Sequence, residues 1–238
     1  METRLLILET SHRVGQVALA RGDAIVGARQ LDESRRHARD LAPAIQELLN
    51  AQGWRARDLD AVVVSIGPGS YTGLRVGIVS AKTLAFATGC ALIGVNTFEA
   101  IALWRQDSDL AGEANRQDRN LAATGNVDVI ADAQQDHVYV QRFGTQPAPL
   151  TILPLKAWLE SARTCNASVT GPGLERFADR VLGLTILPTV YWYVQPTSLL
   201  KIGLARYRKG ERDDPFTVEP LYLRATEAER KWEALKKG

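Results

Sequence analysis

A strand, a glycine-rich turn and a helix follow one another between residues 61 and 87, and this segment most constrains the fold. Residues 61–66 are apolar and rich in β-branched side chains, as in a buried strand. Gly67, Gly69 and Ser70 then permit a tight turn, and Thr72 is placed to cap a helix that runs to about residue 87. Because the start of a helix attracts anions, the turn is a candidate phosphate site.

The first hundred residues repeat this alternation of strands and helices. We expect strands at 5–8, 14–20, 24–31, 61–66 and 91–95, and helices at 36–50, 72–87 and 97–104. Pro43 should kink the first helix or mark its first turn, and Thr97 is placed to cap the third. Three strands, helix, strand, helix, strand, helix is the order of the ribonuclease-H-like lobe found in the actin, hexokinase and Hsp70 superfamily. The predicted fold class is therefore α/β, with a mixed five-stranded sheet flanked by helices.

A second cycle follows the polar segment 106–126, so we predict two lobes, residues 1–105 and 106–238. Strands are expected at 127–132, 137–143 and 167–170, with a proline-rich connection after 143 and a helix at 155–162. A second Gly-Pro-Gly turn lies at 171–173, which indicates either an internal duplication or a coincidence of common turn residues. Thr197 or Ser198 is placed to cap a last helix that runs to Lys209. A charged tail at 227–237 ends the second lobe.

Composition excludes several classes of protein. The net charge is only +2, whereas proteins that bind nucleic acid alone usually carry a stronger positive bias. The two cysteines are far apart, and the three histidines form no helical pair, so neither a disulfide scaffold nor a metal site is expected. No segment is apolar and long enough for a signal peptide or a membrane span. We therefore expect a cytoplasmic protein.

Small residues share one face of the predicted helix 72–87. Gly73, Gly77, Ser80 and Ala81 recur at three- and four-residue spacing, which lets another backbone approach closely. That backbone belongs either to the chain's own sheet or to another subunit, and we favour the subunit interface. On this interpretation Gly77→Arg should abolish pairing and leave the monomer folded.

An acidic residue closes the first strand, where kinases of the superfamily keep one for a metal-bound nucleotide. Glu9 and Ser11 are therefore further candidates for nucleotide binding, and Asp132 is a candidate second carboxylate. The glycine expected soon after the first acid is displaced to Gly15. A nucleotide-dependent kinase is the alternative function. A peptidase is disfavoured, because Ser70 lacks both the nucleophile frame and a base.

Several motifs resemble one family. The sequence Gly-Pro-Gly-Ser-Tyr-Thr-Gly-Leu-Arg-Val-Gly-Ile at 67–78 resembles the signature of the TsaB (YeaZ) family, which belongs to the bacterial machinery making threonylcarbamoyladenosine in tRNA. Shorter similarities lie at 6–11, at His37, at 94–97, at 132–133 and at 220–224. Gln134 stands where the family usually has arginine, and Glu9 where it often has aspartate.

The resemblance implies an actin-like fold of two ribonuclease-H-like lobes without catalytic power of its own. Such a subunit pairs with a TsaD-like catalytic subunit, is joined by a TsaE-like ATPase, contacts tRNA through the complex and forms a homodimer when isolated. ATP and metal would then lie on the partner subunits. We expect the pairing surface on helices 36–50 and 72–87, with these interface residues: His37, Leu41, Ile45, Leu48, Tyr71, Thr72, Gly73, Arg75, Val76, Gly77 and Ser80.

Overall fold

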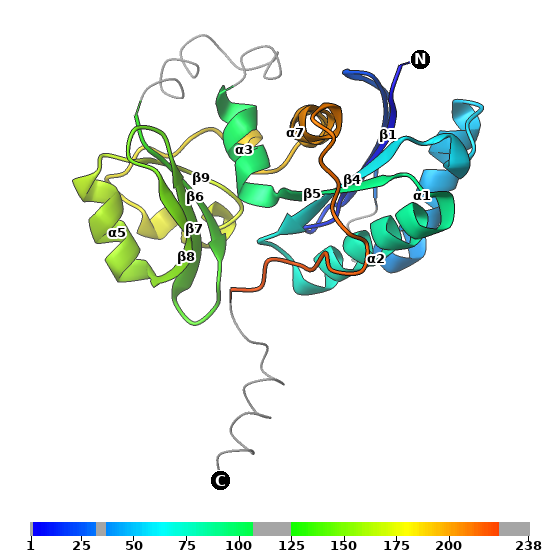
Figure 1. Cartoon of the computed structure of the whole chain (residues 1–238). Helices are drawn as coiled ribbons and strands as arrows, with labels where there is room; N and C mark the ends of the chain where they lie inside the picture. Colours follow the sequence, from blue (N-terminus) through cyan, green and yellow to red (C-terminus); the bar gives the residue numbers. More distant parts are fainter. Residues whose placement is uncertain (1, 32–36, 107–124, 224–238) are drawn as a thin grey trace.

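The protein consists of two α/β lobes, each built on its own β-sheet (Figure 1). The computed structural model describes residues 2–31, 37–106 and 125–223. The predicted segment 106–126 and the tail 227–237 therefore lie almost entirely outside the described residues. No described helix is long and apolar enough to cross a membrane.

The first lobe holds a mixed five-stranded sheet in the order β3-β2-β1-β4-β5. β1, β2 and β3 form an antiparallel meander, and β4 and β5 continue the sheet in parallel with β1. The predicted order of elements is confirmed, with ends that differ by one or two residues. The strands are β1 (Arg4–Glu9), β2 (Gln16–Arg21), β3 (Ala24–Gln30), β4 (Ala61–Gly67) and β5 (Ala91–Asn96).

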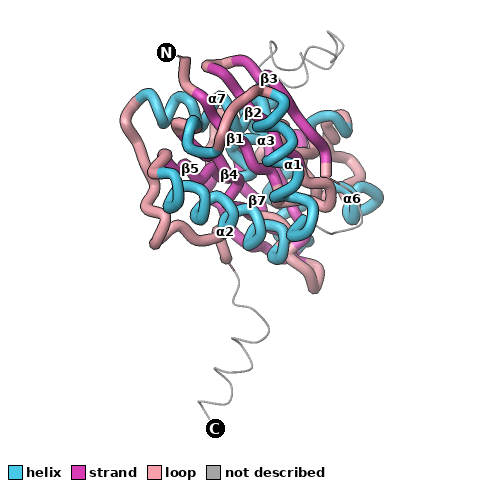
Figure 2. The backbone as a smooth tube through the Cα atoms, turned by 90° about the vertical axis from the view of Figure 1, so that its right-hand side faces the viewer, coloured by secondary structure: helices cyan, strands magenta, loops and turns pink. Residues whose placement is uncertain are grey.

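Two helices cover each face of this sheet, and Figure 2 shows the arrangement from the side. Side chains of β1 alternate between the two faces. Leu6 and Leu8 pack with α1 and α2, whereas Leu5 and Ile7 pack with α3 and α7. The helices are α1 (His37–Ala51), α2 (Tyr71–Thr88), α3 (Thr97–Gln106) and α7 (Pro196–Arg208).

Helix α7 packs on the first lobe, although the predicted division at residue 106 places it in the second. Gly203 makes this possible, because a Cβ atom there would lie 2.5 Å from a methyl group of Val63 in β4. The chain then continues along the edge of the first sheet, where Asp213 accepts a hydrogen bond of 2.7 Å from the amide of Gly94. The first lobe is therefore completed by the last part of the described chain.

Three of the predicted helix caps are wrong. Ser70, and not Thr72, caps α2 by accepting from the amide of Gly73. The side chain of Asn96 accepts from the amide of Phe98 at the start of α3, while the hydroxyl of Thr97 accepts from the amide of Gly67. Helix α7 begins at Pro196, with Gln195 before it, so Thr197 and Ser198 lie inside its first turn. At each start the chain can turn into the helix one or two residues earlier than the sequence suggests.

The second lobe repeats the pattern of the first in a four-stranded sheet of order β8-β7-β6-β9. β6, β7 and β8 form the meander, and β9 is parallel to β6. The predicted proline-rich connection after residue 143 contains β8, an edge strand, where proline's missing N–H is tolerated. The elements are β6 (Val127–Asp132), β7 (His137–Phe143), β8 (Ala148–Pro154), α5 (Leu155–Thr164), β9 (Ser168–Thr170) and α6 (Leu174–Phe177).

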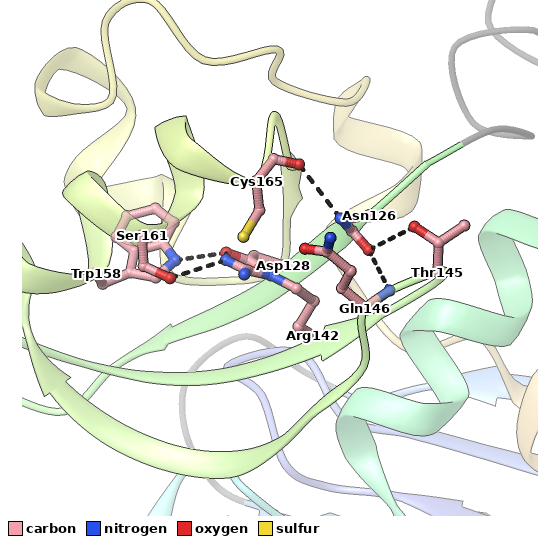
Figure 3. A network of polar contacts seen from close by, with 8 residues as sticks. All are labelled: Asn126, Asp128, Arg142, Thr145, Gln146, Trp158, Ser161 and Cys165. Atoms are coloured by element: carbon pink, nitrogen blue, oxygen red, sulfur yellow. Dashed lines mark hydrogen bonds and ion pairs between the residues drawn. The ribbon is translucent and has the colours of Figure 1, made fainter.

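A buried ion pair ties α5 to the second sheet (Figure 3). Arg142 of β7 donates two hydrogen bonds of 2.6 and 2.8 Å to the carboxylate of Asp128 on β6. The indole of Trp158 donates to the same carboxylate at 2.8 Å, and Arg142 also donates to the hydroxyl of Ser161. The hydrogen bonds to Asp128 raise the pKa of Arg142, so its guanidinium stays charged inside the lobe. We assign this network a structural role.

Candidate functional site

The inner face of α2 packs on its own chain and is not available to a partner. A Cβ atom at Gly73 would lie 2.0 Å from the carbonyl oxygen of Thr10, and one at Gly77 would lie 2.1 Å from the Thr10 hydroxyl. Both glycines are buried. The prediction that they form a subunit interface is therefore wrong, because the small face exists to admit the turn that follows β1. Ser80, at the border of this face, is half-buried.

The apolar face of α1 is likewise part of the core. Leu41 is 1% exposed and Ile45 is 7% exposed, and both pack against the first sheet with α2. Leu48 is half-buried and packs against the same cluster. These three predicted interface residues are accordingly core residues, as the amphipathic spacing of a helix on a sheet requires. The side chain of His37 lies outside the part of the chain that the structure describes.

The outer face of α2 is exposed and partly apolar. Of the predicted interface residues, Tyr71, Thr72 and Arg75 are exposed, and Val76 is half-buried. Val79 is 60% exposed and Phe86 is 71% exposed, and neither was among the predicted residues. Tyr71, Arg75, Val79 and Phe86 follow one another at spacings of four, four and seven residues along one side of the helix. The sequence does contain a signal for Val79 and Phe86, because helical spacing places them on the same side of the helix as Tyr71 and Arg75.

A C-terminal strap, residues 213–223, runs along this outer face. Phe216 contacts Phe86 with ring centroids 5.8 Å apart, and Tyr222 contacts Tyr71 at 5.1 Å, so the strap spans most of α2. Lys82 donates to the carbonyl of Val218 at 3.0 Å. We call the exposed side chains along α2 and the strap the outer stripe: Tyr71, Arg75, Val79, Phe86, Phe216 and Tyr222.

The glycine-rich turn does not form an open phosphate cradle. The amide of Ser70 donates to the carbonyl of Ser11 at 2.7 Å, the amide of Gly67 to Thr97, and the amide of Gly73 to Ser70. A Cβ atom at Gly69 would lie 2.5 Å from the same carbonyl of Ser11. The turn is thus packed against the end of β1, and the amides of Gly67 and Ser70 are occupied within the chain. That Gly67, Gly69 and Ser70 bind phosphate stays a prediction.

A cavity of about 380 Å³ lies between the two lobes. Glu9 lines this cavity, whereas Ser11 does not. Ser11 donates from its amide and its hydroxyl to the Glu9 carboxylate. Burial raises the pKa of Glu9, and burial also lowers the pKa of His12 to about 4. The lining residues are Glu9, His12, Arg13, Val14, Gln16, Gln30, Glu175, Tyr193, Val194 and Gln195.

The second predicted carboxylate has a partner of its own and lies off this cavity. One carboxylate oxygen of Asp132 accepts a hydrogen bond of 2.7 Å from Arg176, and the other accepts one of 2.8 Å from the amide of Gln134. On the facing side, Tyr193 donates to Glu175. Across the described ranges no group of three or more His, Cys, Asp or Glu side chains gathers in a metal-binding arrangement. Within the described residues, Glu9 and Asp132 therefore do not line one cavity together.

Comparison with known proteins places the chain in a family. Residues 31–178 match the family model described as TsaD, tRNA N6-adenosine threonylcarbamoyltransferase. The tRNA threonylcarbamoyladenosine biosynthesis protein TsaB of Bacillus subtilis is 28% identical over 96% of this chain and 97% of its own length. The chain belongs to the TsaB (YeaZ) family. An uncharacterized protein of Mycobacterium tuberculosis is 33% identical over 86% of this chain and 82% of its own length.

Among solved structures, YeaZ from Pseudomonas aeruginosa has the same fold as this TsaB-family chain. The TM-score is 0.72 at 22% sequence identity, over 93% of this chain and 100% of that one. The family predicted from the motifs and the fold of two α/β lobes predicted from the order of elements are confirmed.

Proposed function

We propose that this chain is a non-catalytic subunit that pairs with a TsaD-like transferase for the threonylcarbamoyl modification of the adenosine next to the anticodon in tRNA. The full-length match to a protein named for this biosynthesis supports the pathway. Pairing would use the outer stripe, and a TsaE-like ATPase would join the pair. The chain would contact tRNA only through this complex.

The outer stripe is the observation that carries the proposal. It places Val79 and Phe86 on one side of α2 and Phe216 of the strap against Phe86, and each of the three is at least 60% exposed. Apolar side chains gathered on one face of a soluble protein mark a binding surface, and tyrosine, phenylalanine and arginine are enriched in such surfaces. In the absence of the partner, two copies of the chain would pair through the same stripe.

Two positive features of the lobes support a non-catalytic role. One oxygen of the Glu9 carboxylate accepts from Ser11, and the Asp132 carboxylate pairs with Arg176, so each candidate acid has a partner within the chain. The turn that would hold a phosphate packs on Ser11 instead. ATP and metal would therefore act on the partner subunits.

Reconstitution of the tRNA modification tests this function. The purified chain, a TsaD-like subunit, a TsaE-like ATPase, threonylcarbamoyl-adenylate and unmodified tRNA are combined, and each protein is omitted in turn. We expect modified tRNA only when both the chain and the transferase are present, and co-elution of the two in size-exclusion chromatography. Modification without the chain would contradict the proposal, and so would ATP turnover by the chain alone.

A further inference from the structure

Arg75 is a fixed charge in the outer stripe. Its guanidinium carbon lies 4.1 Å from the ring centre of Tyr71 and 5.9 Å from that of Tyr222, and its Nε donates to the Tyr222 hydroxyl at 3.1 Å. Many other arginines form ion pairs with carboxylates, whereas Arg75 forms none with the described residues. The described part of the chain therefore orients this cation without pairing it with a carboxylate.

We propose that Arg75, held between Tyr71 and Tyr222, binds a carboxylate that the partner subunit presents from an apolar helical face. The inference rests on the proposed function and names the chemistry of the same pairing surface. A guanidinium held in one orientation matches a carboxylate with two parallel hydrogen bonds and loses little side-chain freedom on binding.

A protein carboxylate fits the surroundings of Arg75 better than a phosphate of RNA does. Val79 lies one helical turn beyond Arg75 at 60% exposure, and Phe86 and Phe216 form an exposed aromatic pair further along. A nucleic-acid site would instead gather several cations to match the regular phosphate charges. The stripe offers one cation followed by apolar side chains, which is the pattern of a protein interface with a charged anchor.

The strap explains how the orientation of Arg75 is maintained, and it gives a role to the closing motif at 220–224. The amide of Leu221 donates to the carbonyl of Ile66 at 2.8 Å, which fixes the strap beside the end of β4. Leu221 also lies against Gly67 at the glycine-rich turn. Tyr222 is thereby placed over the first turn of α2, where its hydroxyl accepts from Arg75. We assign Tyr222 as a positioning residue for the anchor.

The test measures affinity between the full-length chain and the TsaD-like subunit by calorimetry at low and high salt. The variants are Arg75→Gln, Arg75→Lys and Tyr222→Phe. The matched control is Arg212→Gln, because Arg212 also lies 4.1 Å over a tyrosine ring, that of Tyr207, at the end of α7. Circular dichroism checks that each variant folds, and retention of tRNA by the complex is measured in parallel.

Arg75→Gln should weaken pairing by about thirtyfold or more and reduce its salt dependence. Arg75→Lys should recover only part of the loss, Tyr222→Phe should lose less, and Arg212→Gln should pair normally. Normal pairing by Arg75→Gln, with a wild-type chain that does bind, would overturn the inference and leave the proposed function standing. A loss of tRNA retention with unchanged pairing would also overturn it, in favour of phosphate. No complex with the wild-type chain would contradict the proposed function itself.

Discussion

The two Gly-Pro-Gly turns of this TsaB-family protein are the same structural device followed by different helices. Gly67 and Gly171 have φ angles of 109° and 108°, and each turn packs against the end of the first strand of its lobe. The turn of the first lobe leads into α2, which has 18 residues and an exposed outer stripe. The turn of the second lobe leads into α6, which has four residues and buries Leu174 and Phe177.

This comparison separates structure from function. Both lobes keep the turn, but only one carries a long exposed helix, so the turn serves packing and the proposed recognition belongs to the helix that follows it in the first lobe. The equivalent positions also favour the internal duplication over a coincidence of turn residues, because β8-β7-β6-β9 repeats the order β3-β2-β1-β4.

The largest expected effect comes from filling the inner face of α2. Gly77→Arg should lower the free energy of unfolding by about 4 kcal/mol or more, because its Cβ atom alone would overlap the side chain of Thr10. Thr83→Arg, at an exposed position of the same helix, should change it by about 0.5 kcal/mol or less. Urea denaturation measures both. A Gly77→Arg chain of normal stability would show that the inner face is open after all.

Filling one tightly packed glycine of each turn tests whether both turns are packed against the first strand of their lobe. Gly171→Ala should cost about 3 kcal/mol and Gly69→Ala somewhat less, because each added Cβ would lie within 2.5 Å of a carbonyl oxygen and only Gly171 also has a left-handed φ. Gly183→Ala is the control, with positive φ but open space, and should cost about 1 kcal/mol. If Gly171→Ala were no worse than the control, the second turn would not be packed as the first is.

The helices after the turns should differ in binding. Phe86→Asp should weaken pairing with a TsaD-like subunit by about 2 kcal/mol or more, because it puts a charge into the exposed aromatic pair of the outer stripe. Leu182→Asp in the second lobe should leave affinity unchanged, although Leu182 is 74% exposed and Phe86 is 71% exposed. Calorimetric titration of both variants separates exposure as such from position on α2. Equal losses at the two sites would remove the distinction between the lobes.

The smallest effect is expected where the lobes meet, at His12, whose ring lies 5.6 Å from that of Tyr193. Burial lowers the pKa of His12 from 6.5 to about 4, so the unfolded chain binds the extra proton first. The stability contributed by neutral His12 is therefore present above pH 6.5 and is lost as the pH falls to 4. Burial raises the pKa of Glu9, so its effect on stability has the opposite sign: the stability contributed by neutral Glu9 is present at low pH and is lost as the pH rises.

Replacing His12 with glutamine should accordingly make the loss of stability between pH 6.5 and 4 smaller by about 1 to 2 kcal/mol. Denaturation curves of the variant and the wild type at several pH values measure this. His137→Gln is the control, since that histidine lies half-buried at the start of β7 and contacts a backbone carbonyl. Identical pH profiles for the His12 variant and the wild type would mean that His12 is hydrated in the folded protein.

The sequence predicted the order of elements well because hydrophobic periodicity and turn residues are local signals. It could not decide which side of α2 faces the core, since a row of small residues serves close packing inside a chain and between chains alike. The position of Thr10 decides which side faces the core, because Thr10 lies against Gly73 and Gly77 in the folded chain, where β1 and β4 are paired. The strap was equally hidden, because Tyr222 meets Arg75 across 147 residues.

Photo-cross-linking from single positions is the most direct test of the claim that the outer stripe binds the partner. A benzophenone side chain is placed at Val79 in one full-length chain and at Leu182 in another, and each is irradiated with the TsaD-like subunit. We expect the covalent heterodimer from position 79 and none from position 182. A heterodimer formed from position 182, with none from position 79, would contradict the account.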